Sequence, residues 1–226
     1  VLFRSNELSA VTATTTDYVV IEDVTDNTTK KALVSDLQST VINFSVKVAD
    51  DGSGSQNVYY FLSGSDSGAG TKSVTLDLSS GFTYKFDISD SSMSGHPLQF
   101  STTADGSHNS GSEFTTNVTK SGTGGSTGDY VQIEITPETL GTAGATKTLY
   151  YYCPNHSGMG GAINTNTTHG SSNFAGSLQA TVSSNPTAGF SVVKYTGVTG
   201  AQTFGHELGA VPKVVFCKNL DSTSSS

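Results

Sequence analysis

The chain has 226 residues, of which 13% are charged and 34% are hydrophobic, and its formal net charge is -8. Nucleic-acid binding requires clustered Lys and Arg that neutralise phosphates, and the sequence has no such cluster, so we expect no nucleic-acid partner. No apolar run is long enough to cross a bilayer, so we expect no membrane partner. The abundance of Gly, Ser, Thr and Asn favours short strands joined by turns over a helical bundle.

Residues 1–43 are predicted to form an N-terminal leader. The codons GTG CTC TTC CGA TCT would encode Val1–Ser5, and this string resembles the end of a sequencing adapter, which predicts an artefact at residues 1–5 of a metagenomic fragment. The alternative is an ordinary strand start. The β-branched residues of Asp17–Asp23 predict a strand. Residues 6–43 resemble a module of bacteriophage tail-fibre proteins, and the residues that carry this resemblance are the predicted strand and Lys30–Leu37.

Residues 44–165 are predicted to form one all-β domain. Short alternating or aromatic segments separated by Gly, Asn and Asp are typical of a sandwich or barrel. The strands are expected at Phe44–Val48, Val58–Leu62, Ser73–Leu78, Phe82–Ile88, Leu98–Thr102, Tyr130–Ile135 and Thr148–Cys153. The Gly-Ser-Thr tract of Ser121–Gly128 is expected to be a loop within this domain.

Two further segments follow. Residues 166–188 are polar and are predicted to be mainly a linker, with a strand at Ser177–Val182 as the exception. Residues 189–226 are predicted to be the truncated start of a second β domain. Within it, Gly189–Gly197 and Gly205–Phe216 resemble the opening strands of a domain of phage tail proteins that is often lectin-like.

The residues with the clearest chemistry lie in one short loop after an aromatic strand. Cys153, His156 and Met159 have the spacing Cys-x-x-His-x-x-Met, and His96 supplies a second imidazole after a turn at Gly95. One thiolate, two imidazoles and a weak axial thioether are the ligands of type 1 copper sites. The sequence therefore predicts a site for one copper ion with these four ligands.

Other interpretations of these residues stay open. Zinc also accepts a Cys/His/His set, a disulfide could join Cys153 to Cys217, and the four residues could be packing residues of a metal-free fold. His108 is predicted to be a solvated loop residue, and His169 and His206 are predicted to be structural or exposed. Asp50–Gly52 lacks the spaced carboxylates of a calcium loop and is expected to be a turn.

The upstream His96 and the later Cys-x-x-His-x-x-Met loop together resemble the cupredoxin family, and so does the strand Gly81–Asp87 before the first histidine. The resemblance covers about half of the chain. It implies a Greek-key sandwich, with His96, Cys153 and His156 as equatorial ligands, Met159 as the axial ligand, and one-electron transfer between Cu⁺ and Cu²⁺.

Taken together, these observations predict an all-β chain: a Greek-key, cupredoxin-like β-sandwich with flanking short β segments. The expected function is a copper-binding module of a phage tail or fibre structural protein, and the alternative is a metal-free adhesion or spacer domain of a virion protein. Hydrolase and nucleotide-binding motifs are missing, so we expect no enzyme and no catalytic residues. The expected location is the virion or the extracellular space, with other virion proteins or a host surface as partners and a homo-oligomer as one expected state.

Overall fold

We describe the chain from a computed structural model that covers residues 18–23, 28–33, 40–63, 70–72, 74–136, 139, 148–166 and 170–220. The chain divides into two compact units, Val1–Thr40 and Val41–Ser226. The division lies close to residue 43, where the leader was predicted to end. The predictions for residues 1–5, 35–37, 73, 169 and 221–226 lie outside the described residues.

The first unit contains a two-stranded antiparallel sheet. Strand β1 (Tyr18–Asp23) pairs with β2 (Thr28–Leu33), and Tyr18 lies opposite Leu33. The β-branched run predicted a strand here, and the structure contains one.

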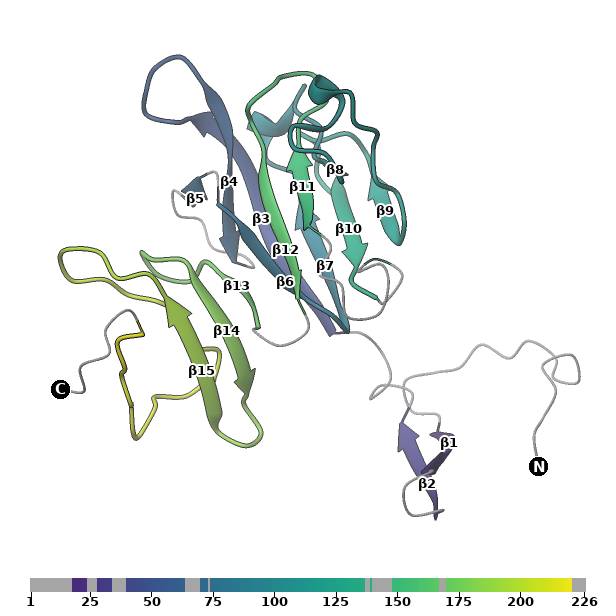
Figure 1. The fold of residues 1–226 in the computed structure, drawn as a ribbon, viewed down its shortest axis with the longest axis vertical. Helices are drawn as coiled ribbons and strands as arrows, with labels where there is room; N and C mark the ends of the chain where they lie inside the picture. Colours follow the sequence, from purple (N-terminus) through teal and green to yellow (C-terminus); the bar gives the residue numbers. More distant parts are fainter. Residues whose placement is uncertain are drawn as a thin grey trace, which may run out of the picture. The chain divides into compact units, whose positions relative to one another are not determined.

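The second unit is built on two sheets that pack face to face (Figure 1). The larger sheet has the strand order β5-β4-β3-β7-β10-β9. Its strands are β3 (Thr40–Asp50), β4 (Asn57–Ser63), β5 (Thr71–Lys72), β7 (Phe82–Asp87), β9 (Val118–Ser121) and β10 (Tyr130–Glu134). The Gly-rich tract after β9 is a loop, as predicted.

The smaller sheet has the order β6-β12-β11-β8. Its strands are β6 (Leu76–Ser79), β8 (Gln99–Ser101), β11 (Thr148–Tyr152) and β12 (Gly161–Asn166). Strand β12 lies between β6, to which it is parallel, and β11, to which it is antiparallel. This arrangement confirms the prediction of an all-β sandwich.

Aromatic side chains from both sheets fill the space between them. Strand periodicity explains this, because alternate residues of β4, β7 and β11 point to the same face. The Phe61 ring lies 5.0 Å from that of Tyr151, and the Phe86 ring lies 5.7 Å from that of Phe100, so both pairs join one sheet to the other. Cys153 and Met159 belong to the same buried cluster.

A third sheet corrects the prediction of a polar linker at residues 166–188. Strands β13 (Ser171–Asn173) and β14 (Ala180–Asn185) lie in that segment, and β14 pairs with β15 (Phe190–Tyr195). Strand β14 overlaps the one strand expected there, Ser177–Val182, whereas β13 was not predicted. All three residues of β13 are buried although they are polar. They are hydrogen-bonded, as in the 2.5 Å contact between Ser171 Oγ and Tyr84 Oη, so polar composition here does not indicate a loop.

Phe174 connects this third sheet to the sandwich. Its side chain is 5% exposed, and its ring lies 5.4 Å from that of Phe44 and 5.9 Å from that of Phe61. Its backbone N–H donates to Ser63 Oγ at 2.7 Å. Phe174 therefore continues the core of the sandwich, and the predicted end of that domain at residue 165 does not coincide with a break in packing.

The part of the chain that the structure covers contains only short 3-10 helices, η1 (Ser91–Met93) and η2 (Gly106–Asn109), in addition to an isolated helical residue at Thr139. None of its helices has the length and apolar character needed to span a membrane.

Candidate metal centre

Three of the four predicted ligands converge at one end of the sandwich. The ligand atoms of His96, Cys153 and His156 all lie within 4.8 Å of one another. Cys153 Sγ is 3.6 Å from His156 Nδ1, and the two imidazole rings have centroids 4.5 Å apart. Among the described residues, this is the one such group of His, Cys, Asp and Glu side chains.

The end of β11 positions the thiol and the second imidazole. Cys153 directly follows Tyr152, the last residue of β11, and its side chain is 0% exposed. The chain then turns and brings the exposed His156 within 3.6 Å of Cys153 Sγ, and Gly158, two residues later, has a φ of 75° that favours glycine. The thiol is thus supplied from the core and His156 from the surface.

His96 lies in the turn between η1 and β8. Gly95 has a φ of 78°, and the His96 backbone N–H donates to Met93 O at 2.9 Å. The imidazole Nδ1 of His96 is buried and has no hydrogen-bond partner, which is true of only one other side-chain N or O atom in the described residues, Ser191 Oγ. A buried polar atom without a partner costs free energy, and a metal ion bound there would satisfy it.

The surroundings of His96 favour its neutral form. Burial lowers the pKa of His96, and the neighbouring His156 lowers it further. A lower pKa favours the uncharged imidazole, which is the form that binds a metal ion.

Met159 lies three residues after His156 and is 0% exposed. Its side chain belongs to the same core cluster as Cys153, and its backbone carbonyl accepts a hydrogen bond from the Tyr59 N–H at 3.5 Å. The described contacts bring His96, Cys153 and His156 together, whereas the axial role of Met159 stays a prediction.

Tyr59 contacts the segments of all these residues, although its own segment had no predicted role in the site. Its phenol donates to the carbonyls of Pro97, at 2.8 Å, and His96, at 3.2 Å. Burial raises the pKa of Tyr59, and the adjacent Cys153 raises it further. No local sequence signal identifies this role, because Tyr59 is an ordinary inward-facing residue of β4 and its partners lie 37 and 38 positions away.

Polar contacts fix the loop that carries the ligands. Asn155 Nδ2 donates to Gly95 O at 2.9 Å, and the Gly158 N–H donates to Asp105 Oδ1 at 3.0 Å. His108 is exposed, as the prediction of a solvated loop residue requires, but its Nε2 also lies 3.0 Å from Cys153 O. Because a carbonyl oxygen only accepts, this nitrogen carries the proton.

Close packing behind the loop requires glycine at residue 160. A Cβ on Gly160 would overlap the carbonyl oxygen of Tyr151. The Gly-Gly pair after Met159 therefore lets the chain return against β11 and begin β12.

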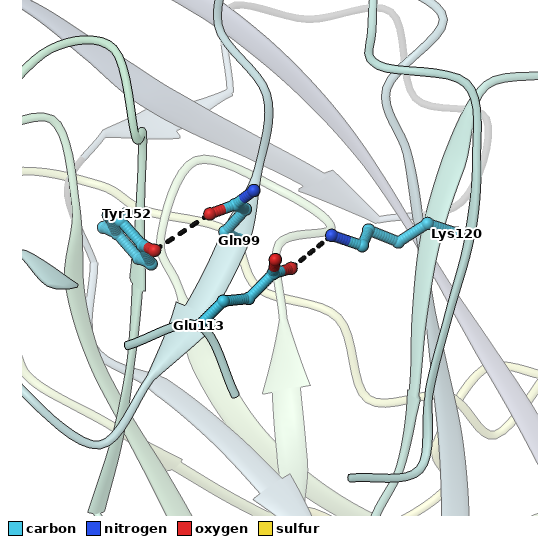
Figure 2. Close-up of polar contacts among 4 residues, drawn as sticks. All are labelled: Gln99, Glu113, Lys120 and Tyr152. Carbon is cyan, nitrogen blue, oxygen red and sulfur yellow. Dashed lines mark hydrogen bonds and ion pairs between the residues drawn. The ribbon is translucent and has the colours of Figure 1, made fainter. Parts of the chain in front are cut away.

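Tyr152 anchors the end of β11 on the face opposite to the core. Its hydroxyl donates to Gln99 Oε1 of β8 at 2.8 Å, as Figure 2 shows. Nearby, Lys120 of β9 forms an ion pair with Glu113, which joins the two sheets at their edge (Figure 2). Partly exposed ion pairs contribute little free energy, so the hydrogen bond and burial of Tyr152 hold this strand end.

The remaining candidates have structural explanations. Both cysteines are free thiols, Cys153 buried and Cys217 exposed, so the structure does not contain the disulfide considered as an alternative. Asp50 Oδ1 accepts hydrogen bonds from the N–H groups of Gly52, at 2.7 Å, and Gly54, at 3.0 Å. These contacts confirm the predicted turn.

Comparison with known proteins adds one partial match. The family described as "Domain of unknown function (DUF7483)" matches residues 161–226, which begin at β12 and include β13 to β15. His96, Cys153, His156 and Met159 all precede the matched residues. No curated protein and no solved structure matches the chain.

Proposed function

We propose that the sandwich is a cupredoxin-like module that binds one copper ion through His96, Cys153 and His156, with Met159 as the axial ligand. The observation that carries this proposal is the convergence of the ligand atoms of one thiol and two imidazoles within 4.8 Å. One of these imidazoles, that of His96, has a buried Nδ1 without a hydrogen-bond partner. Random surface histidines do not leave a buried nitrogen unsatisfied, because that arrangement is costly.

The donor set favours copper over zinc. A thiolate and a thioether are soft ligands that suit copper, and two imidazoles complete a trigonal set. Structural zinc sites take four Cys or His ligands, and thioethers are not among the usual zinc ligands. Met159 is buried in the same core cluster as Cys153, which is compatible with a thioether ligand.

Bound copper would supply a one-electron couple between Cu⁺ and Cu²⁺. The contribution of the chain is to hold the ligands in place before the metal arrives. Cys153 is fixed by the end of β11, and His96 is fixed by its bond to Met93 and by the Tyr59 phenol. The exposed His156 is the ligand that solvent reaches first.

The setting of the module is a separate part of the proposal. The resemblance of residues 6–43 and 189–226 to phage tail and fibre proteins supports a non-enzymatic virion component. Its partners would then be other virion proteins or a host surface. A metal-free adhesion or spacer domain is the competing function, and copper binding decides between the two.

The test is an anaerobic titration of the full chain with Cu²⁺, followed by visible absorption and electron paramagnetic resonance. We expect an intense thiolate-to-copper band that saturates at one equivalent, with narrow hyperfine splitting. Cys153→Ser should lose the band, whereas Cys217→Ser, which removes the exposed thiol, should retain it.

Copper should also raise the melting temperature of the wild-type chain and of Cys217→Ser, because a ligand that binds only the folded state stabilises it. A colourless protein whose melting temperature does not change with Cu²⁺ would favour the metal-free domain. A thermal shift with Zn²⁺ and none with Cu²⁺ would favour a zinc site.

A further inference from the structure

Residues 103–111 form a polar excursion between β8 and β9. The excursion is closed at its base, where Ser101 pairs with Glu113 and the Ser101 hydroxyl donates to Ser112 O at 2.8 Å. Backbone hydrogen bonds within it, such as Gly111 N–H to Gly106 O at 2.9 Å, give it a defined shape around η2. We call residues 103–111 the clamp and residues 153–159 the ligand loop.

We infer that the clamp holds the ligand loop in its ligand-presenting shape before any metal binds. Two hydrogen bonds from the clamp reach both ends of this loop. His108 Nε2 donates to the carbonyl of Cys153 at 3.0 Å, and Asp105 Oδ1 accepts from the N–H of Gly158 at 3.0 Å. His156 lies between these two points, so the clamp fixes the backbone on either side of the exposed ligand.

Backbone geometry supports this inference. Asp105 has a φ of 58°, in the left-handed region that non-glycine residues seldom adopt. Such a conformation costs free energy and persists where surrounding contacts require it. Here, the conformation accompanies the bond of the Asp105 carboxylate to Gly158.

Packing provides a third contact. A Cβ on Gly106 would overlap the ring of Tyr152, the residue that precedes Cys153. The clamp thus lies directly against the end of β11. Glycine at this position permits the approach that brings Asp105 and His108 to the loop.

The inference deepens the proposed function, on which its metal-binding part rests. Partners that orient metal ligands typically change metal affinity by about 10- to 100-fold when removed. Asp105 and His108 act on the backbone of the loop rather than on the metal, so they are positioning residues.

The experiment uses the full chain and two matched pairs of variants. Asp105→Gly removes the acceptor and tolerates the positive φ, whereas Asp105→Asn tolerates that φ and keeps an oxygen that accepts the same bond. His108→Ala removes the donor, whereas His108→Gln keeps an N–H donor. Thr102→Ala, an exposed neighbour of the clamp, is the control.

The first measurement is amide hydrogen exchange in the metal-free protein. We expect the Gly158 amide to exchange about tenfold faster in Asp105→Gly than in the wild type, because it loses a hydrogen bond to a charged acceptor. His108→Ala should accelerate exchange across the ligand loop. Asp105→Asn, His108→Gln and Thr102→Ala should stay close to the wild type.

The second measurement is Cu²⁺ affinity, followed through the thiolate-to-copper band. We expect Asp105→Gly and His108→Ala to bind at least about tenfold more weakly, with rescue by the conservative variants. Exchange rates and affinities equal to those of Thr102→Ala would overturn the inference. If the wild-type chain binds no copper, the proposed function fails, and the exchange measurement alone decides whether the clamp exists.

Discussion

Replacing Tyr59 with phenylalanine isolates one hydroxyl behind the candidate metal centre. The ring should keep its place, because it is 0% exposed and packs edge-on against Tyr151 with centroids 6.1 Å apart. What is lost is the donor to the carbonyls of Pro97 and His96. These residues are half-buried, so water compensates in part, and we expect a loss of about 1–2 kcal/mol in the free energy of unfolding.

For a chain of this size, that loss corresponds to a decrease of roughly 2–8 °C in melting temperature. Circular dichroism of the metal-free protein measures it. Copper affinity should also fall about tenfold, because the carbonyl of His96 loses the contact that fixes this ligand. A copper titration of the same samples measures the second effect.

Tyr60→Phe is a matched control on the neighbouring residue. The Tyr60 hydroxyl also donates to a carbonyl at 2.8 Å, but its acceptor is Asp50 O in an exposed contact away from the candidate ligands. We expect its effect to stay within about 0.5 kcal/mol, without a change in copper binding. Equal effects of the two variants would refute the reasoning that Tyr59 supports the ligand segments.

Three further predictions concern the scaffold. Burial raises the pKa of Tyr84 to about 12. Between pH 10 and 12 the unfolded chain releases this proton while the folded chain keeps it, so the free energy of unfolding should fall by about 1.4 kcal/mol per pH unit. Urea unfolding at a series of pH values measures this slope, and Tyr84→Phe should flatten it. Phe174→Ala should cost about 3–5 kcal/mol by urea unfolding, because it empties a buried ring site between the third sheet and the sandwich; an effect below 1 kcal/mol would contradict that packing. Gly160→Ala should destabilise the fold by more than about 2 kcal/mol through overlap with the Tyr151 carbonyl, whereas Gly197→Ala, with nothing near its Cβ, should be close to neutral.

Local sequence patterns were sufficient for several strands with large apolar residues, but not for Gly205–Phe216, which was expected to contain an opening strand and contains none. In Phe82–Asp87 the core residues are Tyr84 and Phe86, and in Thr148–Tyr152 they are Leu149 and Tyr151; both strands form where the pattern predicted them. The spacing from Cys153 to His156 also predicted a convergence, because a turn of that length brings the two side chains together. His96 was identified from its place after a glycine turn, and the structure brings it to the same point.

The remaining features depend on contacts between distant residues. Strand β13 was missed because its Ser-Ser-Asn sequence carries no apolar signal, and its burial relies on partners such as Tyr84, 87 positions away. Likewise, the hydrogen bond that the Asp105 carboxylate accepts comes from Gly158, 53 positions later. Composition and periodicity report only near neighbours, so neither could reveal these contacts. Copper and the virion setting stay predictions.

The position of β12 has a practical consequence for dividing the chain. The residues that match the family begin at Gly161, yet this strand lies inside the smaller sheet, between β6 and β11. A cut at residue 161 would therefore separate a central strand from both of its neighbours and expose the backbone of each piece. The matched stretch is therefore not an independent unit of the fold, and a fragment meant to keep the candidate metal centre has to continue at least through Phe174.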